Sequence, residues 1–386
     1  MLRTTVIGIG NAGGNVAKLV HEEAKFPAIA INTSNQDLKS VGDSIPVILF
    51  GDGKGIGKNR DDSKAELKKA IQAIVASDKM QAVLNDAELI FVVSSCGGGT
   101  GSGSALILAT ILSFSYPDAN IIIVGIAPQL GEGFDSQANF TEYYKDLKKK
   151  AGEITYMMYD NEQYTNLPHK QMIDVVNHQI CQHIRVLSGY YNNQTDLDSI
   201  DDRDLETILS YPGRLVVASA QEIKERDVET SDNIEEMIID NLKASAIAEP
   251  QKDRRVEAFG VIADISDKIP FNPQVPLVRQ YIGEPINTFK HISINMDKAL
   301  PNEVYLILSG LSIIRNRKDR AVEVMKDIQK KQAAFEVDDD DDDDDDLDEL
   351  KSYKTKRAPK KKKTANNPDE EGGTPTFNDI FKAFGA

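Results

Sequence analysis

A glycine-rich stretch between two apolar segments is the part of this sequence best suited to chemistry. Residues 97–103 read Gly-Gly-Gly-Thr-Gly-Ser-Gly, with the apolar run 88–93 before them and the apolar run 105–112 after them. This order predicts a strand, a loop and a helix. Glycines let backbone amides approach an anion closely, and the N-terminus of the following helix attracts negative charge. The pattern therefore predicts a phosphate cradle, to which the hydroxyls of Thr100 and Ser102 add donors.

Two further glycine-rich turns follow apolar strands near the N-terminus. The first spans residues 8–15 and contains a G-x-G-x-x-G pattern, and the second spans residues 51–57 and is rich in basic neighbours. The first turn alone equally suits a dinucleotide-dependent oxidoreductase, which stays open as an alternative. Against it, the next strand ends in Asn32 where an acidic residue would hold the ribose of NAD. One polyphosphate held from several sides explains all three loops better.

The succession of apolar strands and helices predicts an α/β fold with a mainly parallel sheet covered on both faces. Ligands of such sheets bind at the carboxyl ends of the strands, where all three glycine loops are expected. A long helix is predicted near residues 170–190, and a smaller α+β region follows from Leu215. The predicted parts are a nucleotide-binding domain, a central helix, a C-terminal activation domain and a charged tail, at residues 1–169, 170–191, 192–335 and 336–386.

Composition excludes several classes of function. The net charge of −16 argues against nucleic-acid binding through the general field of the protein. No run of eighteen apolar residues predicts a membrane span. The two cysteines, Cys96 and Cys181, and the five histidines lack metal-ligand spacing. We therefore expect a cytoplasmic protein without a metal held by protein ligands alone.

The tail carries opposite charges in succession and ends in an apolar stripe. Residues 338–346 are all aspartate and residues 354–363 are strongly basic, so we expect this segment to be disordered. The basic block would bind either phosphate backbones or the neighbouring aspartates. At the end, one helical face carries Phe377, Ile380, Phe381 and Phe384. Such a stripe suits the groove of a partner protein, although a fraying end with chance spacing has the same pattern.

The string at residues 97–103 resembles the G-G-G-T-G-[ST]-G signature of the tubulin/FtsZ superfamily of GTPases. The resemblance extends over residues 3–335 in the order of elements, and it implies that the chain binds GTP or GDP with Mg²⁺ held mainly by phosphates and water. It also implies a filament built head to tail from copies of the chain. The nucleotide contacts implied by the matching positions are Gly10, Asn11, Ala12, Asn15, Asn32, Gly55, Gly57, Gly97, Gly98, Gly99, Thr100, Gly101, Glu132, Asn161 and Asn177.

An acidic loop at residues 192–205 follows the predicted central helix. On the residues alone, a solvated loop that caps the next helix is the simpler interpretation. The resemblance implies a sharper one, because Asp201 and Asp204 align with carboxylates that reach the nucleotide of the next subunit and orient the attacking water. Polymerisation would then activate the GTPase, since phosphoryl transfer depends mainly on positioning and charge stabilisation.

Three positions depart from the common family pattern: Ser34, Ile173 and Ser199. With the charged tail, they make the chain resemble most the plasmid- and phage-encoded TubZ branch, and next the PhuZ branch. That resemblance implies segregation or positioning of plasmid or phage DNA in a prokaryotic or phage-infected cell, with a tail that binds a DNA-bound adaptor protein. A division protein of the FtsZ type is the alternative within the family.

Overall fold

A ten-stranded sheet forms the centre of the protein, as described by a computed structural model. The structure describes residues 1–189, 199–244, 256–294, 301–313, 316–338 and 375–386. The described strands lie in the order β3-β2-β1-β4-β5-β6-β7-β10-β8-β9. They are β1 (Thr4–Ile9), β2 (Ala28–Asn32), β3 (Val47–Leu49), β4 (Leu89–Ser95), β5 (Asn120–Ala127), β6 (Thr155–Asp160), β7 (Gly213–Ala220), β8 (Val256–Ile265), β9 (Pro285–Ile294) and β10 (Glu303–Leu311).

The first six strands are all parallel, as the sequence predicts. Strand β1 lies between β2 and β4, with Gly8 opposite both Ala30 and Val93. Every residue of β1 and β2 is buried. Such continuous burial requires helices on both faces of the sheet, which explains why these strands are uniformly apolar rather than alternating.

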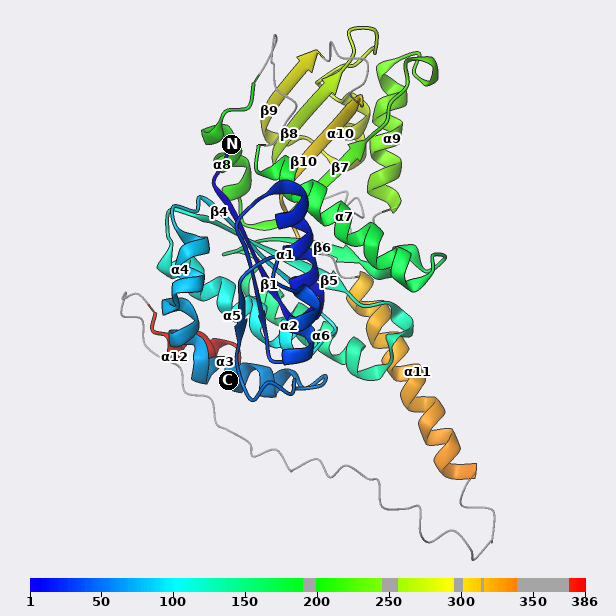
Figure 1. Cartoon of the computed structure of the whole chain (residues 1–386). Helices are drawn as coiled ribbons and strands as arrows, with labels where there is room; N and C mark the ends of the chain where they lie inside the picture. Colours follow the sequence, from blue (N-terminus) through cyan, green and yellow to red (C-terminus); the bar gives the residue numbers. More distant parts are fainter. Residues whose placement is uncertain (190–198, 245–255, 295–300, 314–315, 339–374) are drawn as a thin grey trace, which may run out of the picture.

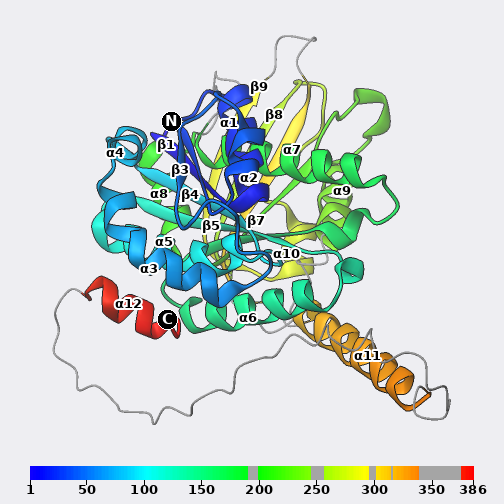
Figure 2. The same ribbon diagram turned by 60° about the horizontal axis from the view of Figure 1, so that its bottom comes forward.

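Two layers of helices supply this cover. One buried cluster joins the sheet to α1, α2, α7 and α8, and a second joins its other face to α3, α4, α5, α6 and α12. Figures 1 and 2 show these layers. The helices are α1 (Gly10–Ala24), α2 (Asn35–Val41), α3 (Arg60–Ala76), α4 (Asp78–Leu84), α5 (Thr100–Ser115), α6 (Phe134–Lys150), α7 (His169–Leu187), α8 (Asp202–Ser210), α9 (Ser231–Ala244), α10 (Pro276–Ile282), α11 (Asn316–Asp338) and α12 (Phe377–Ala383), with short 3-10 turns η1 (Leu130–Glu132), η2 (Asn161–Tyr164) and η3 (Glu225–Asp227).

The C-terminal region continues the same sheet. Strand β7 joins β6 in parallel, β10 then runs antiparallel to both β7 and β8, and α9 and α10 cover this part with a third buried cluster. The predicted smaller α+β region is therefore present as a continuous extension of the nucleotide-binding sheet. The last of its parallel pairs joins β9 to β8, beginning at Pro285 opposite Val256.

The predicted long central helix is α7, which packs against α1. Helix α11 extends away from the sheet, whereas α12 lies under α3 and beside α6 (Figure 2). Most of the predicted disordered tail, residues 339–374, lies outside the described residues, as do residues 192–198 of the acidic loop. Within the described chain, no helix is both long enough and apolar enough to cross a membrane.

Candidate functional site

The three glycine loops meet at the carboxyl ends of adjacent strands. Gly10 has a φ of 75°, and a Cβ placed on it would lie 3.3 Å from the backbone nitrogen of Gly101. A Cβ on Gly99 would clash with the carbonyl oxygen of Gly57. Side chains at these positions would separate the loops, so the glycines allow the backbones to touch.

A fourth segment, at the end of β2, ties the loops together. The Oγ1 atoms of Thr33 and Thr100 lie 2.8 Å apart, and the amide of Gly55 donates to the carbonyl oxygen of Thr33 at 2.9 Å. Asn32 is buried, and its Oδ1 accepts hydrogen bonds from the amides of Thr33 and Ser34. The segment at Asn32 and Thr33 thus lies beside the loops at residues 51–57 and 97–103.

The N-termini of α1 and α5 open into this cradle without a capping side chain. Their N-cap positions are Ile9 and Gly99, and neither makes a side-chain hydrogen bond to the first turn. By contrast, Ser34, Asn59 and Ser77 cap α2, α3 and α4. Free amides at two converging helix ends are the donors that a phosphate chain accepts from. The residues present therefore fit a bound polyphosphate.

Two buried side chains beneath the cradle were not predicted from the sequence. Nδ2 of Asn139, on α6, donates to the carbonyl oxygens of Lys58 at 2.9 Å and Gly97 at 3.2 Å. Nε of Arg60, the first residue of α3, donates to the carbonyl oxygen of Ser102 at 2.9 Å. Together they fix α3 and the end of the loop at residues 51–57 against the loop at 97–103.

Asp146 completes this support from α6. Its Oδ2 lies 2.6 Å from Nη2 of Arg60 and 3.5 Å from Nζ of Lys64, and all three side chains are buried. Burial raises the pKa of Asp146, but the adjacent Arg60 and Lys64 outweigh it and lower the pKa below its ordinary value. Burial, and then Arg60, lower the pKa of Lys64. The lowered pKa favours the ionised carboxylate of Asp146, which lies beside the Arg60 guanidinium and the Lys64 amine.

Comparison with known proteins identifies the part of the chain that holds this cradle. Residues 3–167 match the family described as "Tubulin/FtsZ family, GTPase domain". The predicted enzyme class is thereby confirmed, and GTP or GDP with Mg²⁺ is the nucleotide of this family.

Sequence relatives extend beyond the GTPase domain. The tubulin-like protein CetZ2 of Haloferax volcanii is 27% identical over 286 residues, which cover 70% of this chain and 77% of the relative. The cell division protein FtsZ 2 of the same organism is 29% identical over 227 residues, 56% of this chain. That match spans about half of the length of this relative, 53%.

Solved structures share the fold over most of the chain. A protofilament of Bacillus thuringiensis serovar israelensis TubZ has a TM-score of 0.70 at 17% identity and covers 87% of this chain and 94% of TubZ. A protofilament of Haloferax volcanii CetZ2 has a TM-score of 0.67 at 20% identity and covers 85% of this chain and 99% of CetZ2. The predicted tubulin/FtsZ-like α/β fold is confirmed. The TubZ and CetZ2 structures resemble this chain to a similar degree.

Two of the predicted base and ribose contacts lie in short 3-10 turns, and the third lies on helix α7. Glu132 ends η1, and its Oε1 accepts from the amide of Gln129 at 2.9 Å. Asn161 begins η2, which is joined to η1 by a hydrogen bond from the amide of Leu130 to Glu162. Asn177 is half-buried on α7. The elements fit the expected arrangement, and the contacts of these three side chains with a nucleotide stay predictions.

The acidic pair lies at the other end of the domain. The amide of Asp204 donates to Oδ1 of Asp201 at 2.8 Å, and the two form the capping box of α8. Next to them, Oδ1 of Asp202 lies 2.8 Å from the N-terminal amine of Met1. Met1 precedes β1 and Gly10 follows it, so a strand about 20 Å long separates the acidic pair from the cradle. Figure 1 shows the N-terminus beside α8. One subunit does not bring these two groups together.

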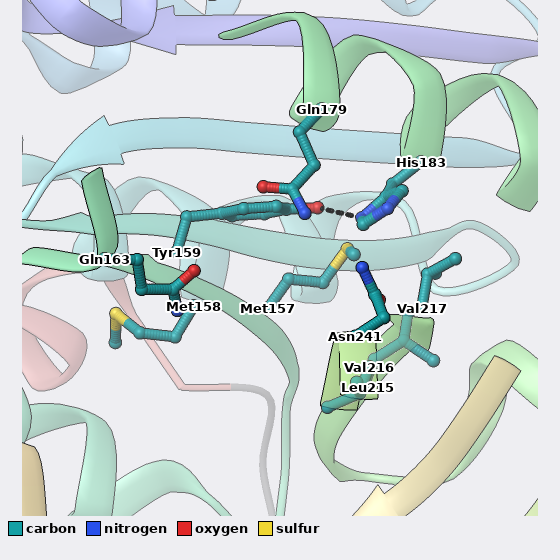
Figure 3. Close-up of a pocket in the computed structure, with 10 residues that line it drawn as sticks. All are labelled: Met157, Met158, Tyr159, Gln163, Gln179, His183, Leu215, Val216, Val217 and Asn241. Carbon is teal, nitrogen blue, oxygen red and sulfur yellow. Dashed lines mark hydrogen bonds between the residues drawn. The ribbon is translucent and has the colours of Figure 1, made fainter. Parts of the chain in front are cut away.

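A small cavity away from the cradle lies between β6, α7, β7 and α9 (Figure 3). Its volume is about 40 Å³, and the Tyr159 hydroxyl lies 2.7 Å from Nδ1 of His183 at its wall. Burial lowers the pKa of His183 to about 3, so this imidazole is neutral at physiological pH. A space of this size holds a water molecule or two rather than a nucleotide. Among the described residues, no cluster of three histidine, cysteine or acidic side chains could hold a metal ion.

Proposed function

We propose that this chain forms filaments and hydrolyses GTP at the interface between successive subunits. The observation that carries the proposal is that the phosphate cradle and the Asp201–Asp204 pair lie at opposite ends of β1. The phosphate cradle lies after Ile9, and Asp201 and Asp204 lie near Met1. Head-to-tail stacking is the arrangement that apposes these two ends, and such heterologous contacts continue into an open filament.

The chemistry asked of the residues is mainly positioning. The free amides at the starts of α1 and α5, with the Thr100 hydroxyl, would hold the phosphates. GTP with its Mg²⁺ would supply the transferred phosphoryl group and the cation that neutralises its charge. Asp201 and Asp204 of the adjoining subunit would orient a water molecule toward that group. Each is exposed or half-exposed at the end of α8, where it is free to reach a neighbouring subunit.

The similar CetZ2 and TubZ structures support this proposal, since both are described as protofilaments bound to or formed with a GTP analogue. Within the class, we propose a role in positioning plasmid or phage DNA, supported by the likeness to TubZ and by the basic block at residues 354–363. A DNA-bound adaptor is the partner expected for the tail. A role in cell division is the second candidate, favoured by the sequence match to FtsZ 2.

Dependence on protein concentration tests the shared site directly. Phosphate release and light scattering are measured over a range of protein concentrations with GTP, with ATP and NAD as controls. We expect GTP alone to produce scattering, and hydrolysis to begin above the same threshold concentration. Hydrolysis strictly proportional to protein from zero concentration would contradict the proposal, because each subunit would then be complete.

A further inference from the structure

The last residues of the chain pack against its own GTPase domain. Ile380, Phe381 and Phe384 on and after α12 are each less than 5% exposed and belong to the same buried cluster as α3 and α5. Phe377 is partly buried and packs against the same cluster, whereas Asn378 and Lys382 are exposed. The apolar stripe seen in the sequence is thus already covered within this subunit.

Polar contacts fix the position of this peptide. Nζ of Lys64, on α3, donates to the carbonyl oxygen of Phe384 at 2.6 Å, and Nζ of Lys68 donates to that of Ala386 at 3.2 Å. The Lys68 ammonium also lies 5.8 Å from the centre of the Phe381 ring. At the other end, Thr376 and Asp379 form a capping box. These contacts satisfy both ends of a helix too short to persist in isolation.

The peptide also borders the nucleotide loops. A cavity of about 980 Å³ lies between the loop at residues 51–57, α3, α6 and the end of the peptide. Its walls include Lys58, Arg60, Asn139 and Phe384. Arg60 and Asn139 join α3 and the end of the loop at residues 51–57 to the loop at 97–103, and Lys58 lies beside that junction. The covered surface is therefore continuous with the support of the cradle.

From these contacts we propose that the surface formed by α3, α5 and α6 is a binding site for residues 376–386 of the same chain. The peptide is a tethered ligand, and an external partner that needs its apolar face has to displace it first. Residues 339–374 connect it to α11, so binding is intramolecular, with an effective concentration on the order of millimolar where the connection spans the distance.

Hydrogen exchange of the full-length protein tests this assignment. The variant is Phe381→Asp, and the matched control is Asn378→Asp, which adds the same charge to the exposed face of the same helix. We expect the amides of residues 380–384 to exchange at least about tenfold faster in the Phe381→Asp variant, because an undocked helix of this length melts. The control should match the unmodified protein, and protection should not change on dilution. Equal exchange in all three proteins, or protection lost on dilution, would overturn the proposal.

A labelled peptide with the sequence of residues 375–386 gives an independent measurement. It should bind the full-length Phe381→Asp variant, whose site is vacated, at least about tenfold more tightly than the unmodified protein, whose site is filled. A peptide carrying Asn378→Asp should bind equally well. Equal affinity for the two proteins, or no binding to either, would contradict a site on this surface.

Discussion

Asn139 joins two loops of the phosphate cradle from a helix that carries none of the signature glycines. Its side-chain amide donates to the backbone carbonyl oxygens of Lys58 and Gly97, so one side chain is hydrogen-bonded to both loops. Arg60 does the same between α3 and Ser102. At the scale of residues, the glycines permit close approach, and buried polar side chains determine which backbones meet.

His183 gives the chain a predictable sensitivity to acid. Its pKa is lowered by burial from 6.5 to about 3 in the folded protein, so between these values the unfolded chain binds a proton that the folded chain does not. The free energy of unfolding should therefore fall as the pH drops from about 6.5 toward 3, by up to about 1.4 kcal/mol per pH unit from this group.

The variant His183→Gln isolates this contribution while leaving an acceptor for the Tyr159 hydroxyl. Thermal unfolding measured between pH 7 and pH 4 should show a shallower loss of stability in the variant than in the unmodified protein. The exposed His169→Gln serves as control and should behave like the unmodified protein. Identical pH profiles for all three proteins would show that the buried imidazole does not titrate as described.

Under the proposed function, helix α8 would serve two purposes. Its capping box uses the carboxylates of Asp201 and Asp204, which is the simpler interpretation of the acidic loop, and it also presents them at the surface. Capping and water orientation differ in one respect. An uncharged amide oxygen still caps a helix, whereas a water-orienting carboxylate loses its role when it loses its charge.

The substitution Asp204→Asn separates the two roles. We expect the free energy of unfolding to fall by less than about 1 kcal/mol, since the hydrogen bond to the Asp201 amide is kept. We expect GTP binding to persist, hydrolysis to fall by at least about a hundredfold, and filaments to become long-lived. Glu206→Gln, two residues further along α8, is the matched control. A normal rate of GTP hydrolysis in Asp204→Asn would remove that residue from the mechanism.

Prediction from the sequence succeeded where local pattern determines structure. The long apolar strands and helices α5 and α7 were anticipated, as was the meeting of the glycine loops at one edge of the sheet. The short helices α2 and α4 were missed, because seven residues carry little periodicity. Asn139 and Arg60 were missed because their partners are distant backbone carbonyls. The stripe at the C-terminus predicted a helix, but only the fold shows which surface covers it.

At the scale of the whole molecule, β1 separates two functional ends. Its N-terminal end lies beside α8 and its C-terminal end opens into α1 and the cradle. A stack of subunits would join the acidic end of one to the cradle of the next. This arrangement predicts that a subunit with a disabled cradle can still contribute its acidic end to the site of its neighbour, and that a subunit with a disabled acidic end can still contribute its cradle.

Mixing two inactive variants tests the central claim most directly. Gly99→Ala places a methyl group against the loop at residues 51–57 and should disable the cradle. Asp204→Asn leaves the cradle intact. Circular dichroism confirms that each variant is folded, and phosphate release is then measured for each alone and for an equal mixture. The account predicts that the mixture recovers about a quarter of the normal rate, because one interface in four then pairs an intact cradle with an intact acidic end. A mixture no more active than the sum of its two components would contradict a site shared between subunits.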